Sequence, residues 1–399
     1  MKRRIGVVTV ARSDYSILYP LLRAIEADPA LALQLIVAGM HLAPEFGNTV
    51  AAIEADGFAI ADRVAMLLPA DDPRSDQPAG VAIATGRGVI GFAEAFARNR
   101  PDLLVVMGDR FEMFGAAIAA LPLRIPVAHI HGGELSEGAI DDAMRHAMTK
   151  LSHLHFTSTE TYRDRVIQLG EEPWRVVASG APALDNLHAL PRLSEEELKR
   201  RFGLTFAARP LVVTYHPTTL GAADVDAEID ALLAALRRAG RPIVFTAPNA
   251  DAGGRRIAER IGAFAADFGK ADVVSNLGLQ GYYSLLSLAA AMVGNSSSGI
   301  IEAASFALPV VSVGDRQKGR LAPRNVIHVP ADAPAIADAI EMACGAGFRR
   351  GLAGLTNPYG TGHAVPRIVE TLRSVELGQR LLQKSFHDLT PARTGEAAA

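Results

Sequence analysis

The chain has a single cysteine, Cys344, among its 399 residues. One cysteine cannot form an internal disulfide, and it cannot supply the several thiolates of a cysteine-based zinc site. Nothing in the sequence therefore points to an oxidising compartment. We expect the protein to work in the cytoplasm.

An excess of charge of one sign is also missing. The sequence carries 40 Lys and Arg residues against 43 Asp and Glu residues, which gives a net charge of −3. A general nucleic-acid-binding protein would show a basic excess, so we expect no nucleic acid as a partner. The balance still permits a local cationic pocket for phosphate groups.

Long hydrophobic runs are absent as well. The apolar run Ile5–Val10 follows a basic start but stops before Arg12. It is shorter than the ~7–15 residues of a signal-peptide core. No unbroken apolar stretch approaches the ~18 residues that cross a bilayer. We therefore expect no membrane partner.

Apolar residues nevertheless make up 49% of the chain, enough for two sizeable cores. They gather in short continuous runs, which are typical of parallel strands buried on both faces. The predicted strands are 5–10, 33–38, 103–107, 127–130, 154–157 and 176–179, then 211–215, 243–246, 273–274, 291–293, 310–313 and 326–329. Crossover helices fit between them. The pattern predicts an α/β protein with two Rossmann-like, doubly wound domains facing a cleft.

The predicted linker lies near Pro182–Pro191, before a helix that Ser194 would cap. We expect one domain over residues 1–186 and a second over 187–365. Residues 366–386 would complete the first domain as one long helix, because apolar side chains recur at helical spacing from Arg367 to Phe386. The polar stretch 387–399 is predicted to be a disordered tail.

Polar side chains cluster where the predicted strands end. In open parallel sheets, ligands bind beyond the carboxyl ends of the strands. The residues at these ends are Arg12, Asp109, Arg110, His131, Glu134, His216, Asn249, Asn295–Ser298, Asp315 and Arg316. Both halves therefore offer a polar rim, and the cleft between them is the expected site.

Two stretches in the second half could bind phosphate. Gly294–Gly299 contains three serines and enters a helix that carries Glu302, so it could cradle a diphosphate or could simply be a serine-capped helix start. Gly314–Arg320 places three cations in a glycine-bounded turn, which could clamp an anion or be a solvated loop. Glu302 would suit the two hydroxyls of a ribose better than a phosphate.

The run His129–Glu134 combines two histidines, a glycine turn and a carboxylate. Histidines two apart on a strand share a face, so a metal site is conceivable, although no further ligand pattern supports one. Asp141 follows, with Arg145 one helical turn later. The three carboxylates Asp109, Glu134 and Asp141 near one strand rim suit acid–base work on a sugar.

Gly86–Gly91 matches the dinucleotide fingerprint GxGxxG, with Asp109 near the required distance. That fingerprint normally follows the first strand of its unit, whereas 81–99 reads as one helix. We therefore disfavour a nicotinamide-dependent dehydrogenase.

Five motifs together resemble the UDP-N-acetylglucosamine 2-epimerases, in particular the hydrolysing branch that serves sialic and legionaminic acid synthesis. The likeness runs from residues 12–15 to 357–360. Its most specific pieces are GDRFE at 108–112, the run at 129–156, YHPTT at 215–219, GNSSSGIIEA at 294–303 and GDRQKGR at 314–320.

The resemblance implies a fold of the glycosyltransferase-B type, no cofactor and no metal, and a dimer or tetramer. It implies removal of the nucleoside diphosphate across C1 and C2 of the sugar, then addition of water to give N-acetylmannosamine or a related sugar. By the family pattern, the residues on the diphosphate would be Arg12, His216, Ser296, Ser297 and Arg316 or Arg320. Glu302 would hold the ribose, and Arg145 would orient Asp141 within the acid–base set Asp109, Glu134 and Asp141. We also count Arg110, Asn249 and Ser298 as substrate-binding, and His131 and His216 as catalytic.

One position departs from the family. Other members carry Glu where this chain has His131, so His131 or Glu134 would take over as the base, and we favour Glu134 with His131 as its partner. UDP and GDP remain alternatives for the nucleotide. The rival functions are a non-hydrolysing epimerase, a glycosyltransferase of the same fold and a nucleotide-sugar-binding protein without catalysis.

Overall fold

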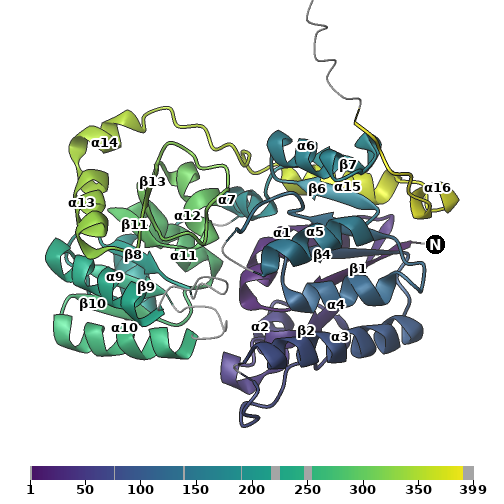
Figure 1. The fold of residues 1–399 in the computed structure, drawn as a ribbon, viewed down its shortest axis with the longest axis horizontal. Coiled ribbons are helices and arrows are strands. Elements are labelled where there is room, and N and C mark those ends of the chain that lie inside the picture. The colour runs from purple at the N-terminus through teal and green to yellow at the C-terminus, as the bar shows by residue number, and fades with distance from the viewer. Residues whose placement is uncertain are drawn as a thin grey trace, which may run out of the picture.

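The computed structural model describes residues 2–75, 77–137, 140–189, 191–216, 225–246 and 254–389. Within these ranges the chain builds two parallel sheets, each covered by helices on both faces (Figure 1). It completes the first sheet before it enters the second, and α15 (Ala364–Ser374) and α16 (Gln379–Leu382) then return to the first (Figure 1). These observations confirm the predicted α/β class with two doubly wound sheets.

The first sheet has seven parallel strands among the described residues, in the order β3-β2-β1-β4-β5-β6-β7. Its strands are β1 (Arg3–Thr9), β2 (Leu31–Ala38), β3 (Ile60–Val64), β4 (Leu103–Met107), β5 (Val127–Ile130), β6 (Leu154–Thr157) and β7 (Val176–Ala178). Its helices are α1 (Arg12–Ala27), α2 (Val50–Ala55), α3 (Pro78–Arg98), α4 (Phe111–Ala120), α5 (Asp141–Leu151) and α6 (Glu160–Gln168), followed by the short α7 (Asn186–Ala189).

The second sheet has six parallel strands among the described residues, in the order β10-β9-β8-β11-β12-β13. They are β8 (Leu211–Thr214), β9 (Ile243–Thr246), β10 (Ala271–Val274), β11 (Ala291–Gly294), β12 (Val310–Val313) and β13 (Val326–Val329). The helices in this half are α8 (Glu195–Phe202), α9 (Val225–Ala239), α10 (Gly254–Phe268), α11 (Gly278–Leu288), α12 (Ser297–Ile301), α13 (Ala333–Cys344) and α14 (Ala346–Gly351).

Apolar side chains alternate across both faces of each sheet. In β1, Ile5 and Val7 join the core formed with α1 and α15, whereas Val8 joins the core formed with α3 and α4. Successive residues of a strand point to opposite faces, so a strand covered on both sides needs apolar residues throughout. This burial explains the continuous runs in the sequence, and each of the twelve predicted strands is found within two residues of its expected ends.

The edge strand β3 was not predicted. In the described part of the chain it pairs with β2 alone, and its burial alternates, with the charged residues Asp62 and Arg63 in its middle. An edge strand with one covered face tolerates such charges, so it lacks the apolar run that marks the other strands.

The prediction of one long helix over 366–386 is wrong. The structure has α15 and α16 separated by a break, in which Val375 and Leu377 both pack against the first core. Residues two apart point to nearly opposite sides of a helix, so both can reach one core only if the chain leaves the helix. Buried Arg175 then donates to the carbonyl oxygens of Arg380, Leu381 and Gln383, which fastens α16 to the first domain.

The helix α3 contains the GxGxxG segment, as predicted. A Cβ on Gly88 would lie 2.5 Å from Met66 Cε, and one on Gly91 would lie 2.6 Å from Val64 Cγ1. These glycines therefore serve close packing of the helix. Among the described residues, α3 is also the one helix long and apolar enough to cross a membrane, and its Phe92 and Phe96 belong to the core on one face of the first sheet.

The capped start of α8 is confirmed. The Ser194 hydroxyl accepts the amide of Glu197 at 3.2 Å, and the Glu197 carboxylate accepts the amide of Ser194 at 2.8 Å. We propose domain boundaries at 1–186 with 366–386 for the first domain and 187–365 for the second. The predicted tail lies outside the described residues from 390 onward.

Candidate active site

Asp109 follows β4, at the carboxyl edge of the first sheet. Gly108 before it has a φ of +73°, and Arg110 after it is the last residue before α4 begins. The Asp109 carboxylate forms an ion pair with Arg145 of α5, and its side chain keeps 21% exposure. A carboxylate that is held in place but still open to solvent can exchange protons with a ligand.

Glu134 is the centre of the polar network beyond β5. Its Oε1 lies 2.6 Å from His131 Nδ1 and accepts the Ser158 hydroxyl at 2.7 Å. Its Oε2 lies 3.1 Å from Arg320 Nη1 and 3.6 Å from Arg145 Nη1. The predicted pairing of Glu134 with His131 is therefore present in the structure.

The environment of Glu134 keeps it ionised. Burial alone would raise the pKa of this carboxyl, which is only 1% exposed. Electrostatic attraction to His131 and Arg320, with hydrogen bonds from His131 and Ser158, outweighs burial and lowers the pKa to about 2. A carboxylate so strongly stabilised is a weak base at neutral pH.

His131 lies just beyond the end of β5, in the left-handed region with φ of +64°. The alternation of the strand does not extend to it, so the expectation that it shares a face with His129 is wrong. The ring of His129 instead contacts the Gly108 carbonyl at 2.7 Å and the Thr149 hydroxyl at 3.2 Å. Both nitrogens of His129 are thus occupied by groups of the protein.

Arg145 connects the carboxylates. It is 1% exposed, and besides Asp109 and Glu134 it donates to the Ser136 hydroxyl at 3.1 Å. Burial and the nearby Arg320 lower the pKa of Arg145. Asp141, predicted to be oriented by Arg145, begins α5 one turn before it and is half-buried.

In the second domain, Asn295 organises the end of β11. Its side-chain amide accepts the His216 amide and donates to the His216 carbonyl, each at 2.7 Å. Its own carbonyl accepts from Arg316 at 3.2 Å and from Gln317 at 2.8 Å. One buried asparagine therefore brings together three predicted elements: the β8 end, the serine turn and the cationic loop.

The serine turn lies at the start of α12. The Ser296 hydroxyl accepts the Ser298 amide, and Ser298 shares a hydrogen bond of 2.7 Å with the Tyr282 hydroxyl. Ser296, Ser297 and Ser298 are all half-buried. Glu302 follows and accepts the Tyr283 hydroxyl; burial raises the pKa of Glu302 despite this contact.

Two arginines cross between the domains. Arg12 of α1 donates to the Ser275 carbonyl at 2.5 Å, beyond β10. Arg320 of the second domain donates to the Leu135 carbonyl at 3.0 Å and to the Ser136 hydroxyl at 3.3 Å. Arg320 thus joins the cationic loop of the second half to the acid groups of the first half.

Arg110 lies in a separate buried cluster. Its guanidinium contacts Glu112 at 3.1 Å, and burial raises the pKa of Glu112 although the Arg110 charge opposes this. Nearby Asp14 accepts the amides of Val10 and Ala11 at 2.7 Å, and burial raises its pKa to about 6. Arg110 was predicted to bind substrate, and in the structure its guanidinium is paired with Glu112.

Sequence reasoning missed Ser136 and Ser158, which touch the charged groups directly. Ser158 follows β6, so the same rule that found Asp109 and His131 would have found it. The predicted site residue Asn249 and part of the YHPTT motif, residues 217–219, lie outside the described residues.

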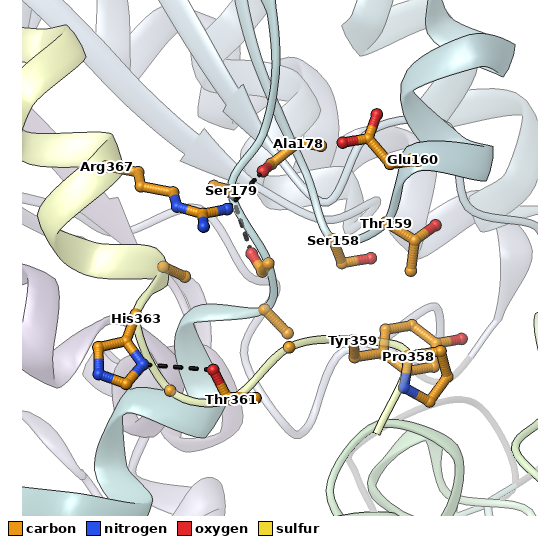
Figure 2. A pocket seen from close by; sticks show the side chains of 15 residues that line it. Ser158, Thr159, Glu160, Ala178, Ser179, Pro358, Tyr359, Thr361, His363 and Arg367 are labelled. Atoms are coloured by element: carbon orange, nitrogen blue, oxygen red, sulfur yellow. Dashed lines mark hydrogen bonds between the residues drawn. The ribbon is translucent and has the colours of Figure 1, made fainter. Parts of the chain in front are cut away.

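Figure 2 shows a pocket of about 170 Å³ beyond β6 and β7, closed by the segment that crosses back to α15. Ser158 and Tyr359 line it, whereas no predicted site residue does. A ligand the size of a nucleotide sugar needs about 300 Å³ or more, so this pocket is too small to be its site. It adjoins the Glu134 network through Ser158, which belongs to both.

Several proteins similar to this chain along most of its length are named as 2-epimerases. A family model described as UDP-N-acetylglucosamine 2-epimerase matches residues 23–373. The chain is 39% identical to the GDP/UDP-N,N'-diacetylbacillosamine 2-epimerase (hydrolyzing) of Campylobacter jejuni, over 82% of this chain and 84% of that protein. It is 35% identical to the UDP-N,N'-diacetylbacillosamine 2-epimerase (hydrolyzing) of Legionella pneumophila, over 96% and 99%.

Among solved structures, the UDP-GlcNAc 2-epimerase of Neisseria meningitidis bound to UDP-GlcNAc is similar, with a TM-score of 0.77. The match covers 93% of this chain and 99% of that chain at 18% identity, and it shows a shared fold. That fold is of the glycosyltransferase-B type, as the sequence predicted.

Proposed function

Because the chain belongs to the UDP-N-acetylglucosamine 2-epimerase family, we propose that it is a hydrolysing 2-epimerase acting on a nucleotide sugar. It converts a nucleoside-diphosphate-linked 2-acetamido sugar and water into the free sugar inverted at C2 and the nucleoside diphosphate. The observation that carries this proposal is the likeness, along most of the chain, to two proteins named as hydrolysing 2-epimerases.

The reaction has two steps, an elimination and a hydration. In the first, the C1–O bond breaks, the diphosphate leaves with the bond electrons, a base takes the C2 proton and a C1=C2 double bond forms. In the second, water adds its hydroxyl to C1 and gives its other proton to a base, while an acid delivers a proton to C2 on the opposite face. The C2 hydrogen is a weak acid, so its removal requires early positive charge at C1 and strong stabilisation of the leaving diphosphate.

We assign the proton transfers to Asp109 and Asp141. Both are less enclosed than Glu134, and Asp109 keeps a partly open carboxylate against Arg145. Glu134 then serves as the ionised anchor that holds His131 and Arg145. This assignment revises the expectation that Glu134 is the base, because a carboxylate with a pKa of about 2 accepts protons poorly at neutral pH.

We assign the diphosphate to the groups around Asn295. Ser296, Ser297, His216 and Arg316 gather around it, and Arg12 contacts the second domain from the first, at the Ser275 carbonyl. Fixed donors aimed at the developing phosphate charge are often the largest contribution to catalysis. Glu302 is proposed to accept from the ribose hydroxyls.

The test is incubation in heavy water with UDP-GlcNAc, GDP-GlcNAc and UDP-N,N'-diacetylbacillosamine, followed by proton NMR. The expected products are a free 2-epimeric sugar carrying deuterium at C2 and the nucleoside diphosphate. An intact epimeric nucleotide sugar would indicate the non-hydrolysing reaction. Free sugar without deuterium at C2 would indicate transferase-type hydrolysis, and no turnover of any of the three would contradict the proposal.

A further inference from the structure

The loop Gly314–Arg320 of the second domain touches both halves of the candidate site. At one end, Arg316 donates to the Asn295 carbonyl beside the serine turn. At the other end, Arg320 enters the acid network of the first domain. The two arginines are four positions apart in the sequence, so the backbone spans at most about 14 Å between them.

The Arg320 guanidinium is fully engaged by the first domain. Its Nε donates to the Leu135 carbonyl, its Nη2 to the Ser136 hydroxyl, and its Nη1 lies 3.1 Å from Glu134 Oε2. The side chain is only 8% exposed. The family pattern left Arg316 and Arg320 as alternatives on the diphosphate, and these contacts separate their positions.

Arg145 and Arg320 flank the same groups from two domains. Both contact Glu134 and both donate to the Ser136 hydroxyl. Arg145 also holds Asp109. A displacement of Arg320 therefore changes the charge balance around Glu134 and, through Arg145, the position of the Asp109 carboxylate.

The backbone around Arg320 is fastened to the first domain. Gly319 has a φ of +81°, a conformation that favours glycine, and a Cβ there would lie 2.7 Å from Glu137 Oε1 and 2.9 Å from Leu135 Cδ1. The residue after Arg320, Leu321, donates its amide to the Tyr162 hydroxyl at 2.8 Å and accepts from the Tyr359 hydroxyl at 2.9 Å.

The two tyrosines also contact each other at 3.1 Å. The single hydroxyl proton of Tyr359 goes to the Leu321 carbonyl, so Tyr162 must be the donor to Tyr359. The two tyrosines therefore hold both backbone polar groups of Leu321, the residue that follows Arg320.

We propose that Arg320 is a positioning residue: it reaches from the second domain into the first and completes the Glu134 network, while Arg316 holds the diphosphate at the other end of the same loop. The loop that binds the nucleotide thereby also positions the proton-transfer groups. The role of Arg320 in turnover rests on the proposed function, whereas its docking on the first domain does not.

The kinetic test compares Arg320→Gln with Arg316→Gln, and Arg324→Gln serves as the control because Arg324 donates to the exposed Ala353 carbonyl. R320Q should lower kcat about 100-fold and leave the Kd of UDP within about threefold, because misplaced reacting groups cost rate without loss of binding. R316Q should raise the Kd of UDP about tenfold or more. R324Q should behave as the wild type.

A double substitution tests whether Arg320 acts through Glu134. If it does, the kcat of R320Q/E134Q should be no lower than that of E134Q alone, since coupled residues are not additive. Multiplied losses in the double variant, or a raised Kd for UDP with unchanged kcat in R320Q, would overturn the proposal.

Hydrogen exchange tests the docking without turnover. The amides of 131–137 should exchange faster in R320Q than in the wild type, with and without UDP, whereas those of 294–302 should keep their wild-type behaviour. Equal exchange at 131–137 in both proteins would overturn the docking role. If the wild type turns over no nucleotide sugar but the exchange result holds, the proposed function fails and the docking inference stands.

Discussion

Glu134 and His131 form a hydrogen-bonded pair, with 2.6 Å between Oε1 and Nδ1. The pair spans three residues across a turn in which His131 itself adopts a left-handed backbone. Asparagine and histidine both tolerate that conformation better than most residues. His131 therefore carries both a conformational and an electrostatic role in this turn.

His131→Asn should keep the turn and remove the imidazole beside Glu134. We expect kcat to fall by up to about 100-fold, because the carboxylate loses a partner that fixes its position. Steady-state kinetics and circular dichroism would check this. His131→Ala should lose a similar factor in kcat and also unfold at a lower temperature, since alanine tolerates the left-handed region less well. A fully active H131N would show that the pair does not support turnover.

Glu134→Gln should make the free energy of unfolding less dependent on pH in the acidic range. The folded pKa of Glu134, about 2, lies below the ordinary value of 4.5, so ionisation stabilises the folded state above pH 4.5. That contribution, on the order of 3 kcal/mol, is lost as the pH falls toward 2.

Urea unfolding of the wild type and E134Q from pH 7 to pH 3 would measure the difference in free energy of unfolding. We expect a constant difference above about pH 5.5 that narrows below about pH 4.5. A difference that stays constant down to pH 3 would contradict the lowered pKa.

Asp109→Asn and Asp141→Asn should each lower kcat about 100-fold or more, because an amide cannot exchange the C2 proton. The Kd of UDP should stay within about threefold, since the proposed diphosphate groups belong mainly to the second domain. Calorimetry with UDP and NMR of turnover would check both parts. Retention of the full rate in either variant would remove that residue from the acid–base set.

Asn295→Ala should weaken UDP binding about tenfold, because it frees the His216 backbone next to the serine turn. It should also lower the free energy of unfolding by about 1–3 kcal/mol, since two buried backbone groups lose their partner. Asn325→Ala is the matched control: Asn325 is equally buried and donates to the Leu308 carbonyl. It should lose stability without a change in the Kd of UDP.

Much of this architecture could be predicted because its determinants are local. Strands covered on both faces require continuous apolar runs. Polar groups that follow parallel strands meet at one edge of the sheet, which explains why Asp109 and Glu134 lie together around Arg145 as the sequence predicted. The edge strand β3 was missed because one of its faces is open, so its sequence has no continuous apolar run. The prediction of one helix over 366–386 was wrong because the spacing of apolar residues does not show that Val375 and Leu377 pack into the same core.

The contacts of Arg320 could not be predicted from the sequence. Its acceptor at Leu135 is 185 residues away in the chain, in the other domain. The local sequence indicated that Arg320 is a cation near the site but not which groups it contacts. It also left Arg316 and Arg320 as equal candidates for the phosphate ligand. The Tyr162–Tyr359 contact, across 197 residues, was hidden for the same reason.

The return of α15 and α16 to the first domain has a consequence for biosynthesis. Leu372 and Leu381 belong to the core that begins with β1, and Arg175 finds three of its acceptors at residues 380–383. During synthesis on the ribosome, the core of the first domain therefore stays incomplete, and Arg175 lacks three of its hydrogen-bond acceptors, until α15 and α16 have been made. The second domain, whose two apolar clusters lie between residues 187 and 344, can be complete before that moment.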